Sequence, residues 1–575
     1  MQRSIQRDFT GGITDYPLDA PTNEFSSMEN LVPQPDGTLR TRHSLSKIDD
    51  IPNPEGKPLV SIWELGPFYI GLTQESKLYW RLKNKSELYT KLYTGDDEAT
   101  KTKIRDWVNL DDFPTSNSVW QCTKFKEHLI LTSPDKEVPG PWMLAAIDST
   151  DSRTGVPGLI KIGIPAPTLI DENRENTHHD QFQGAWRLVV EYSANGIKYR
   201  QEGGMTLFKY RAAGRIPSVD ATFDYPRISH RWPGNFFVTE NEIEGYGFWD
   251  GRYNWVYTNP EDYPTFSPDE MQALIYSIDI DNQALVCATN EHLWLADSRV
   301  LRQSRQGQMV FPDDMKVEFE SNITAISQIQ NVLLVQTETG TYRVDGFYAD
   351  DGSGSVKVRA LSTSEGSISP YTSSTDKDLF FMSKNRISSV SKLDSPSSIG
   401  TKIQLRYKEW IKDRDIKSFY DKNTRQVYFY GLKDADSSAL VYSLDFNCFY
   451  TFRFELPINT ITELNDKIAF INSDGVFEFS ETETSVVQWH LASTMNSLNS
   501  SNHKSLKNIY LEIDGSKVEM TLDTPLFKKE KCDGTTKITI PPRHSRVNRL
   551  QYQISGTGVS HIKSITTDYE VLANG

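Results

Sequence analysis

Residues 323–344 read Ile323-Thr-Ala-Ile326-Ser-Gln-Ile329-Gln-Asn-Val332-Leu-Leu-Val335, a polar turn, and then Thr341-Tyr-Arg-Val344. The order is a spaced apolar lead-in, a tight apolar run, a turn and a closing aromatic strand. It recurs at 275–295 and 458–479, with looser copies at 59–82, 119–145, 373–390 and 416–442. The later lead-ins start near residues 275, 323, 373, 416 and 461. A period in the forties is typical of one four-stranded blade of a β-propeller.

The apolar runs favour strands over helices. Four consecutive apolar residues are too few for a buried helix, but they fit a strand that is covered on both faces. A single blade cannot cover both of its faces, so several blades must stack around an axis. We therefore predict an all-β fold, a β-propeller of roughly five to seven blades with an inserted β-rich domain and a C-terminal β-sandwich-like unit. The best helix signal is 401–412, where Thr401 and Gln404 suggest a capping box; parts of 97–108 suggest a second helix.

The repeat divides the chain into five segments. Residues 1–56 are rich in turn formers and predict an extended arm with one tight hairpin at Asp36-Gly37. Residues 57–164 and 267–482 carry the blades. Residues 165–266 interrupt the repeat with a predicted hairpin around Asn195-Gly196 and an aromatic-rich stretch. Residues 483–575 form a linker and a segment that alternates with period two, which predicts a small β-sandwich.

Composition excludes several classes of protein. The 575 residues include 62 basic and 77 acidic residues, a net charge of −15, whereas tight binding of nucleic acid needs clustered Lys and Arg. Acidic walls would also let DNA slide past without adhesion, although a moderately acidic pI is common for solubility alone. No long apolar stretch or Sec-type signal is present, which predicts a protein folded in a cytoplasm without membrane insertion. Cys122, Cys287, Cys448 and Cys532 are scattered, so neither disulfides nor a metal cluster is expected.

Motifs of catalysis are missing from the sequence. It contains no phosphate-binding loop, Rossmann glycine set, nucleophile elbow, HExxH or paired CxxC. We therefore predict no catalytic, cofactor-binding or metal-binding residues. The weaker candidates, which we interpret as turns, linkers or surface loops, are Asp111-Asp112, Asp250, Asp313-Asp314, Asp350-Asp351, His178-His179-Asp180, Asp279 with Asp281 and Asn282, and the pair Arg302 and Arg305.

Several phrases together resemble one family, the tail nozzle proteins (tail tubular protein B, or DNA-stabilisation class) of short-tailed bacteriophages. In the arm they are Phe9-Thr-Gly-Gly-Ile13, Glu29-Asn30 and Asp36-Gly-Thr-Leu-Arg40-Thr-Arg42. In the blades they are Leu293-Trp-Leu-Ala-Asp297, Gln303-Ser-Arg305, Phe311-Pro312 and the stretch 323–344. At the C-terminus they are Arg549-Leu-Gln-Tyr-Gln-Ile-Ser-Gly556 and 562–569. The chain departs from the family at His43-Ser44, where Pro-Gly often follows the arginine.

The resemblance implies a structural virion protein and no enzyme. Six copies would form a ring below the portal and the adaptor, retain packaged DNA and conduct it during ejection, with tail fibres or spikes docked outside. The protein would be assembled in the host cytoplasm and would lie at the tail tip of the virion. Its hypothetical adaptor or assembly contacts are Phe9, Gly11, Gly12, Asp36, Gly37, Arg40 and Arg42. Its hypothetical gate or subunit contacts are Trp232, Phe236, Phe237, Trp249 and Trp255, in the segment 165–266, which would form the nozzle tip.

Two other functions stay open. The aromatic stretch is also compatible with a sugar platform, so a propeller glycosidase or lectin that acts on host surface polysaccharide is the main alternative. An interaction propeller of the WD-repeat type is the third. The blades lack the Gly-His and Trp-Asp dipeptides of that class.

Overall fold

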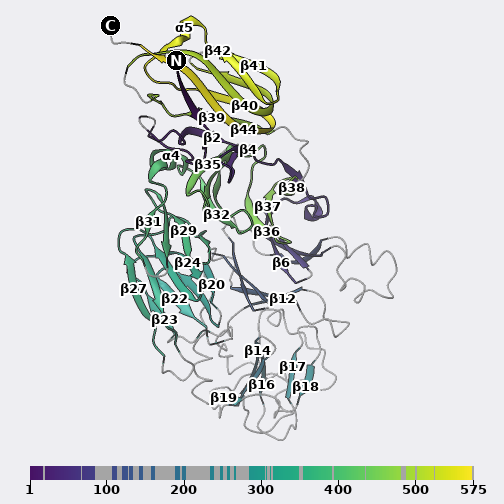
Figure 1. Ribbon diagram of the computed structural model, residues 1–575. Coiled ribbons are helices and arrows are strands. Elements are labelled where there is room, and N and C mark those ends of the chain that lie inside the picture. Colours follow the sequence, from purple (N-terminus) through teal and green to yellow (C-terminus); the bar gives the residue numbers. More distant parts are fainter. Residues whose placement is uncertain are drawn as a thin grey trace, which may run out of the picture. The chain divides into compact units, whose positions relative to one another are not determined.

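The computed structural model describes residues 1–83, 107–112, 120–133, 141–146 and 157–161, six strands between residues 188 and 266, and residues 284–572, with short gaps inside these ranges. Nearly all of the regular structure in these residues is β-strand (Figure 1). The contacts group the chain into two compact units, one of Met1–Trp63 with Leu361–Gly575 and one of Glu64–Ala360. The predicted all-β fold with a β-propeller arrangement is confirmed.

In the part of the chain that the structure describes, five antiparallel blades are each built from four strands that follow one another. They are β6 to β9 (Leu59–Leu65, Phe68–Thr73, Lys77–Leu82, Val108–Asp112), β10 to β13 (Gln121–Phe125, His128–Thr132, Trp142–Ala146, Pro157–Lys161), β20 to β23 (Leu285–Ala288, Leu293–Asp297, Val300–Gln303, Lys316–Glu318), β24 to β27 (Ile323–Ile329, Val332–Thr337, Thr341–Asp345, Lys357–Ser362) and β28 to β31 (Ser373–Ser374, Asp378–Met382, Ile387–Ser391, Ser397–Ser398). The looser copies at 59–82, 119–145 and 373–390 therefore coincide with blade strands.

Two further four-strand groups have a different construction. Strands β36 (Thr460–Leu464), β37 (Lys467–Asn472) and β38 (Gly475–Phe479) are completed by β5 (Leu45–Lys47) from the N-terminal arm. The group of β32 (Asp415–Asp421), β33 (Gln426–Lys433), β34 (Asp436–Ser443) and β35 (Cys448–Arg453) forms one end of a larger sheet. A blade that borrows its last strand from the other end of the chain ties the two ends together.

The apolar runs are buried between neighbouring blades, as strands covered on both faces must be. In β25, residues 333–337 are all buried. Leu333 and Val335 belong to a cluster that also contains Trp294 of β21 and Leu301 of β22, so two successive blades share one core. A buried leucine or valine contributes roughly 1.5–3 kcal/mol. These shared cores supply the stabilisation that one blade lacks on its own.

The apolar run at 284–288, predicted as a blade strand, forms β20, the first strand of its four-stranded sheet. The lead-in at 275–278 lies outside the described residues. We also expected Thr401 to cap a helix. Instead Thr401–Ile403 is a 3-10 turn followed by α4 (Gln404–Trp410), and the hydroxyl of Thr401 bonds Ser398.

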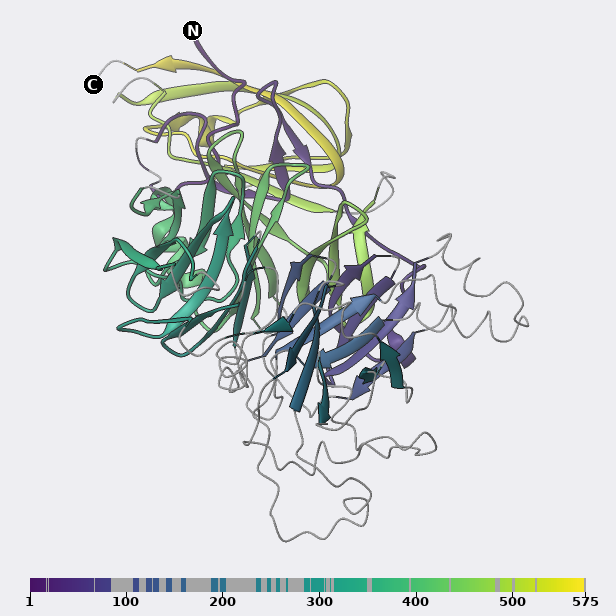
Figure 2. The same cartoon turned by 90° about the horizontal axis from the view of Figure 1, so that it is seen from below.

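A sheet of fourteen strands dominates the first unit (Figures 1 and 2). Its longest members are β40 (Lys504–Thr521) and β44 (Gln553–Val571), which pair along most of their length with several bulges. Its other strands are β1 (Gln2–Gln6), β2 (Phe25–Glu29), β3 (Leu31–Pro33), β4 (Leu39–Thr41), β39 (Gln488–Ser493), β41 (Pro525–Cys532), β42 (Thr535–Thr539) and β43 (Arg546–Val547), together with β32 to β35. The short helix α5 (Pro542–Ser545) precedes β43.

Six strands are described within the inserted segment. Strands β14 (Leu188–Ala194), β15 (Ile197–Glu202), β16 (Gly234–Val238) and β19 (Thr265–Phe266) form one sheet, and β17 (Tyr246–Trp249) pairs with β18 (Trp255–Thr258). The pairing of Ala194 with Ile197 confirms the predicted hairpin across Asn195-Gly196. The helix suggested within 97–108 lies mostly outside the described residues, and Val108 begins β9.

Candidate docking surface of the N-terminal arm

Strands of the N-terminal arm, residues 1–56, pair with later strands of the first unit. Strand β1 pairs with β44, β2 pairs with β39 and β35, β4 pairs with β44, and β5 pairs with β38. The contact grouping accordingly joins residues 1–63 to 361–575. The residues predicted as adaptor contacts therefore have to be divided into those that hold the arm in place and those that face outward.

Gly12 lies where the arm approaches β35 most closely. Its φ is +70°, and a Cβ atom there would lie 2.5 Å from the carbonyl oxygen of Phe449 and 2.7 Å from Cβ of Cys448. The next N–H, that of Ile13, donates to the same Phe449 oxygen at 2.8 Å. Gly11 is restricted as well, because its Cβ would lie 2.5 Å from the carbonyl oxygen of Asn23. The Gly-Gly pair thus permits backbone contact that no side chain would allow.

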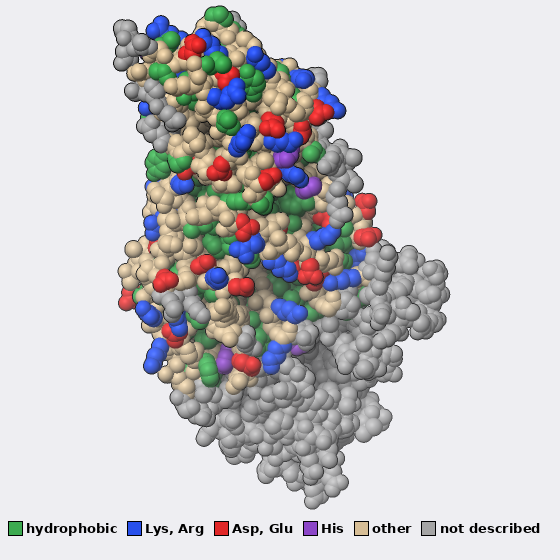
Figure 3. Space-filling model, in the orientation of Figure 1, with side chains coloured by type: hydrophobic (Ala, Val, Ile, Leu, Met, Phe, Trp, Pro, Cys, Tyr) green, Lys and Arg blue, Asp and Glu red, His purple; other side chains and the backbone are tan. Residues whose placement is uncertain are grey.

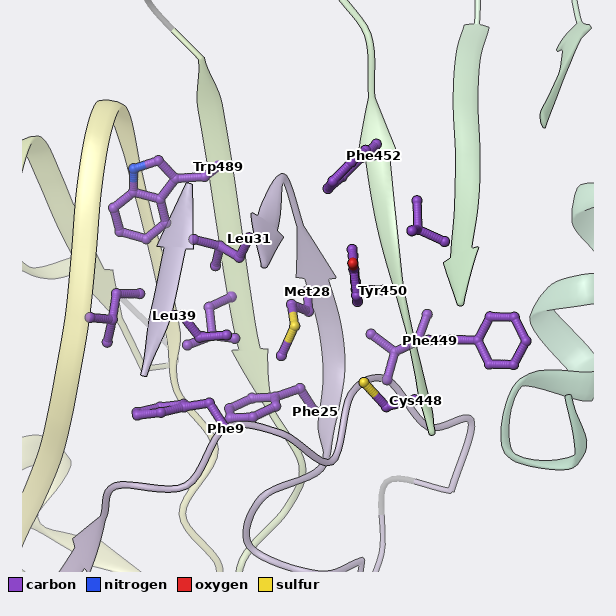
Figure 4. Packing of buried hydrophobic residues seen from close by; sticks show 14 of the residues in the cluster. Phe9, Phe25, Met28, Leu31, Leu39, Cys448, Phe449, Tyr450, Phe452 and Trp489 are labelled. Atoms are coloured by element: carbon purple, nitrogen blue, oxygen red, sulfur yellow. The ribbon is translucent and has the colours of Figure 1, made fainter. Parts of the chain in front are cut away.

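Phe9 is fully buried in this chain's own core. Its ring stacks on that of Phe25, with centroids 5.7 Å apart and an interplanar angle of 15°. Figure 4 shows the two rings side by side, with Leu39 and Met28 close to them. Burying a phenylalanine contributes roughly 1.5–3 kcal/mol. Phe9 therefore anchors the arm.

Asp36 and Gly37 form the tight hairpin that the sequence predicts. The carboxylate of Asp36 accepts hydrogen bonds from the backbone N–H and the hydroxyl of Thr38, and Gly37 has a φ of +83°. The hydroxyl hydrogen bond of Thr38, followed by its backbone hydrogen bond, lowers the pKa of Asp36. The carbonyl oxygen of Gly37 accepts a hydrogen bond from the N–H of Phe9 at 3.0 Å, which connects the hairpin to the anchoring ring.

Arg42 is the most constrained polar residue of the arm. Only 1% of its side chain is exposed. Nε donates to Oδ1 of Asn30 at 2.8 Å, Nη1 donates to the carbonyl oxygen of His43 at 2.8 Å, and Nη2 donates to the carbonyl oxygen of Arg453 at 2.7 Å and to Oε1 of Glu455 at 2.8 Å. The guanidinium also lies over the rings of Phe452 and Phe454, 5.8 and 5.3 Å from their centroids.

The electrostatics of Arg42 follow from this burial. Desolvation lowers the pKa of its guanidinium, and the nearby carboxylate of Glu455 partly offsets that effect. An arginine keeps its charge in such a site because its ordinary pKa lies far above neutral pH. The planar fork can serve several acceptors at once, as a lysine cannot. Arg42 therefore joins the arm to the end of β35 and is not a free contact residue.

The exposed part of the predicted contact set is small. Asp36 and Arg40 are exposed, Gly11 and Gly37 are partly exposed, and Phe9, Gly12 and Arg42 are buried. The guanidinium of Arg40 makes no hydrogen bond or ion pair with a described residue. Figure 3 shows Lys, Arg, Asp and Glu side chains interspersed over the face in view. The arm therefore offers at most a local docking feature around Asp36 and Arg40.

The predicted gate residues lie in the inserted segment. Phe236 and Phe237 are in β16, where they pair with Val190 and Val189 of β14. Trp249 of β17 and Trp255 of β18 are directly opposite one another in the β17–β18 pair. Trp232 lies outside the described residues. Of the five candidates, Trp249 and Trp255 are thus cross-strand neighbours in one pair of strands. Phe236 and Phe237 are adjacent in a strand of a different sheet.

The remaining sequence candidates are scattered. Asp111 and Asp112 end strand β9, so our interpretation of them as turn residues is wrong. Arg302 is in β22, whereas Arg305, Asp250, Asp279, Asp281, Asn282, His178-His179-Asp180, Asp313-Asp314 and Asp350-Asp351 lie outside the described residues. Burial raises the pKa of Cys287 and of Cys448 to about 12. Within the described ranges, no group of three or more His, Cys, Asp or Glu residues is placed to hold a metal ion, and no helix is long and apolar enough to cross a membrane.

The sequence analysis did not predict the roles of two polar residues of the arm, Asp15 and Asn30. Asp15 accepts hydrogen bonds from the N–H groups of Leu405 at 2.7 Å and Arg406 at 3.0 Å, and so caps helix α4. Asn30, with a φ of +56°, holds Arg42 and also accepts from the N–H of Arg453 at 2.9 Å. The only sequence signal for either was its side-chain type, because Asp and Asn are common helix caps and tolerate positive φ.

Comparison with known proteins does not assign a family. No family model matches the chain, and no curated protein matches it. Among solved structures, it is similar to the computationally designed Ika8 protein (9% identity, 75% of this chain and 98% of that one, TM-score 0.30). It is also similar to BBS1N in complex with ARL6DN (7% identity, 77% and 98%, TM-score 0.32) and to BamB from Moraxella catarrhalis (10% identity, 76% and 100%, TM-score 0.30). Similarities this low leave the function to be argued from the chain itself.

Proposed function

We propose that this chain is a subunit of the tail nozzle of a short-tailed bacteriophage. Six copies form a ring that continues the DNA channel below the portal and the adaptor. The ring retains the packaged genome, conducts it during ejection and carries fibres or spikes on its outer surface. Its role is structural and involves no catalysis.

The observation that carries the proposal is the position of the family-like phrases. Those of the arm and those of the C-terminus are separated by about the whole length of the chain, yet they fall on paired strands. Leu39, in the phrase 36–42, pairs with Ile562 of β44, in the phrase 562–569. This is what we expect if the phrases describe a single structural module and not a set of chance matches.

The net charge supports the same function. Six chains of charge −15 sum to −90, since 6 × −15 = −90. A channel with walls of the same sign as the DNA backbone repels the duplex and lets it slide without adhesion. A nucleic-acid-binding protein would need the opposite sign.

The assembly experiment tests the proposal. Purified protein is sized by light scattering, alone and after mixing with the portal and adaptor complex encoded in the same genome. We expect the complex to gain the mass of six chains. A protein that stays monomeric, does not bind the portal and adaptor complex, and releases reducing ends from host polysaccharide would instead be a propeller glycosidase.

The inserted segment is the proposed gate, because it breaks the repeat and carries Trp232, Phe236, Phe237, Trp249 and Trp255. Deleting residues 170–262 should allow particles to assemble but let them lose their genome. The measurement is the DNA content of purified particles over time. If the deleted particles keep their DNA as well as wild-type particles do, the gate lies elsewhere.

A further inference from the structure

A cavity of about 290 Å³ lies beside the arm hairpin in the first unit. Residues 40–44 line one side of it and residues 558–561 of β44 line another, with Val487 completing the wall. The two main walls are held together by main-chain pairing of Leu39 with Ile562 and Arg40 with His561, and by the hydrogen bond from the N–H of Ser560 to the hydroxyl of Thr41 at 3.1 Å. The cavity is therefore a fixed feature of this sheet.

The lining is basic although the chain is acidic. It includes Arg40, Arg42, His43 and His561, and no Asp or Glu is among the lining residues. Arg42 already forms an ion pair with Glu455, with 2.8 Å between Nη2 and Oε1. The guanidinium of Arg40, in contrast, is exposed and has no hydrogen bond or ion pair with a described residue. A guanidinium without a direct partner among the described residues thus lines a cavity in a protein of net charge −15, and the carboxylate that senses its charge is Asp36.

Charged groups of both signs surround His561. Arg40 and Lys563 lower the pKa of His561, after desolvation as the largest cause, while Asp36 and Asp514 raise it. Both carboxylates have other direct partners. Asp514 pairs with Lys563 at 2.7 Å, and Asp36 accepts from the N–H and hydroxyl of Thr38, whose hydroxyl also bonds Nε2 of His561 at 2.8 Å. Neither carboxylate therefore neutralises Arg40 by direct contact.

Size and polarity limit what the cavity can hold. A volume of about 290 Å³ lies at the lower end of small-molecule sites, so a single side chain or a small acid fits better than a larger ligand. Val487 and the exposed Val559 give the cavity an apolar part, and Thr41 and Ser44 add hydroxyl groups. Figure 3 shows histidine side chains beside Lys and Arg side chains on the face near β4 and β44.

We propose that this cavity binds a carboxylate group carried on a short aliphatic stem, as in a glutamate side chain of a partner protein. Arg40 is the charge partner, because its planar fork matches a carboxylate. His43 donates a further hydrogen bond, and the two valines contact the stem. His561 forms part of the wall, because its Nε2 already bonds the hydroxyl of Thr38 at 2.8 Å. The site does not depend on the nozzle function, and a free dicarboxylic acid has the same chemistry.

The test is a titration of the full-length protein labelled with ¹³C-histidine and followed by NMR. The probes are glutarate, the blocked tripeptide Gly-Glu-Gly, its neutral Gly-Gln-Gly counterpart and inorganic phosphate. We expect the ring signals of His43 and His561 to shift saturably with glutarate and with the Glu peptide. Tighter binding of the peptide indicates a protein ligand, and tighter binding of glutarate indicates a free acid. Equal response to the Gln peptide, or tighter binding of phosphate than of both carboxylates, overturns the proposal.

Variants locate the site. Arg40→Gln should weaken glutarate binding at least about tenfold, as expected for loss of a bidentate ion pair. The matched variant Arg546→Gln, which removes an exposed arginine of the same unit, should change it less than twofold. If Arg40→Gln is poorly folded, His43→Gln replaces it and should also weaken binding; unchanged affinity in both variants overturns the assignment.

Discussion

Asn30 accepts a hydrogen bond of 2.8 Å through Oδ1 from Nε of Arg42. The same oxygen accepts from the N–H of Arg453 at 2.9 Å, and Nη2 of Arg42 donates to the carbonyl oxygen of that residue. Two neighbouring residues of the arm therefore satisfy both backbone groups of one residue at the end of β35. Glu29-Asn30 and Arg42 belong to the phrases that carry the family resemblance, and this geometry gives them a structural role.

Replacing Arg42 should destabilise the first unit strongly. Arg42→Ala removes one of the two donors to Oδ1 of Asn30 and the side-chain donor to the carbonyl oxygens of His43 and Arg453, and it removes the cation over Phe452 and Phe454. We expect a loss of about 3 kcal/mol of unfolding free energy. Arg42→Lys keeps the charge but cannot serve the four acceptors, so it should lose most of the same amount. Denaturant unfolding measures both, and Arg40→Ala, an exposed neighbour, should stay within about 0.5 kcal/mol of wild type.

Gly12 should not tolerate a side chain. Gly12→Ala combines an unfavourable φ with contacts of 2.5 Å to the oxygen of Phe449 and 2.7 Å to Cys448. Gly534→Ala is the matched control, because Gly534 has a φ of +73° but nothing within 4 Å of its added Cβ. The control should cost about 1 kcal/mol from backbone strain alone. Gly12→Ala should cost at least about 2 kcal/mol more from overpacking. Equal midpoints of chemical unfolding would show that the arm does not pack on β35.

The cap of α4 provides a third test. Asp15→Ala removes the acceptor for the N–H groups of Leu405 and Arg406 and should cost about 1 kcal/mol. Thr401→Ala should change the stability by less than about 0.5 kcal/mol, because the Thr401 hydroxyl does not bond the helix backbone. Thermal unfolding of the two variants compares a cap supplied from the arm with the cap expected from local sequence. A larger loss of stability in Thr401→Ala than in Asp15→Ala would show that Thr401 caps the helix, as the sequence predicts.

The pKa of His561 gives a prediction with a defined sign. Desolvation, Arg40 and Lys563 lower its pKa from the ordinary value of 6.5. The folded protein therefore binds fewer protons at this site than the unfolded chain does. The resulting stability is fully present above pH 6.5 and is lost as the pH falls through the lower folded value.

Arg40→Gln removes one cause and should raise the pKa of His561, as followed by NMR titration of its ring. Lys563→Gln should act in the same direction. Arg546→Gln is the control and should leave the titration of His561 where it is in wild type. If Arg40→Gln leaves it unchanged as well, Arg40 does not face the cavity.

The blades could be predicted because each strand carries its own local pattern. Val332–Thr337 and Lys467–Asn472 show apolar runs next to turn formers, and neither needs information from distant residues. Leu45–Lys47 has no such pattern. It is only three residues long, and its partner strand Gly475–Phe479 lies more than 400 residues further along the chain. Its pairing is visible only in the structure.

The candidate site was predicted less well, for a related physical reason. Arginine is rarely buried, so composition alone predicts that Arg42, in a polar arm, lies at the surface. Its burial depends on Asn30, Phe452, Phe454 and Glu455, which meet only in the folded sheet. Phe9 is similar, since a single phenylalanine among turn formers carries no periodicity. The residues that do face outward, Asp36 and Arg40, differ from their neighbours only in exposure.

The strand β5 has a consequence for the order of folding during synthesis. It leaves the ribosome early, but β38 cannot pair with it until about 430 more residues have been made. At roughly 5–20 residues per second, the arm waits for some tens of seconds. Residues 64–360 are complete before that moment and can form their own blades first, whereas the first unit must close last, by contacts of very long sequence separation. The arm is thus the first part of the chain to be synthesised and among the last to complete its strand pairing.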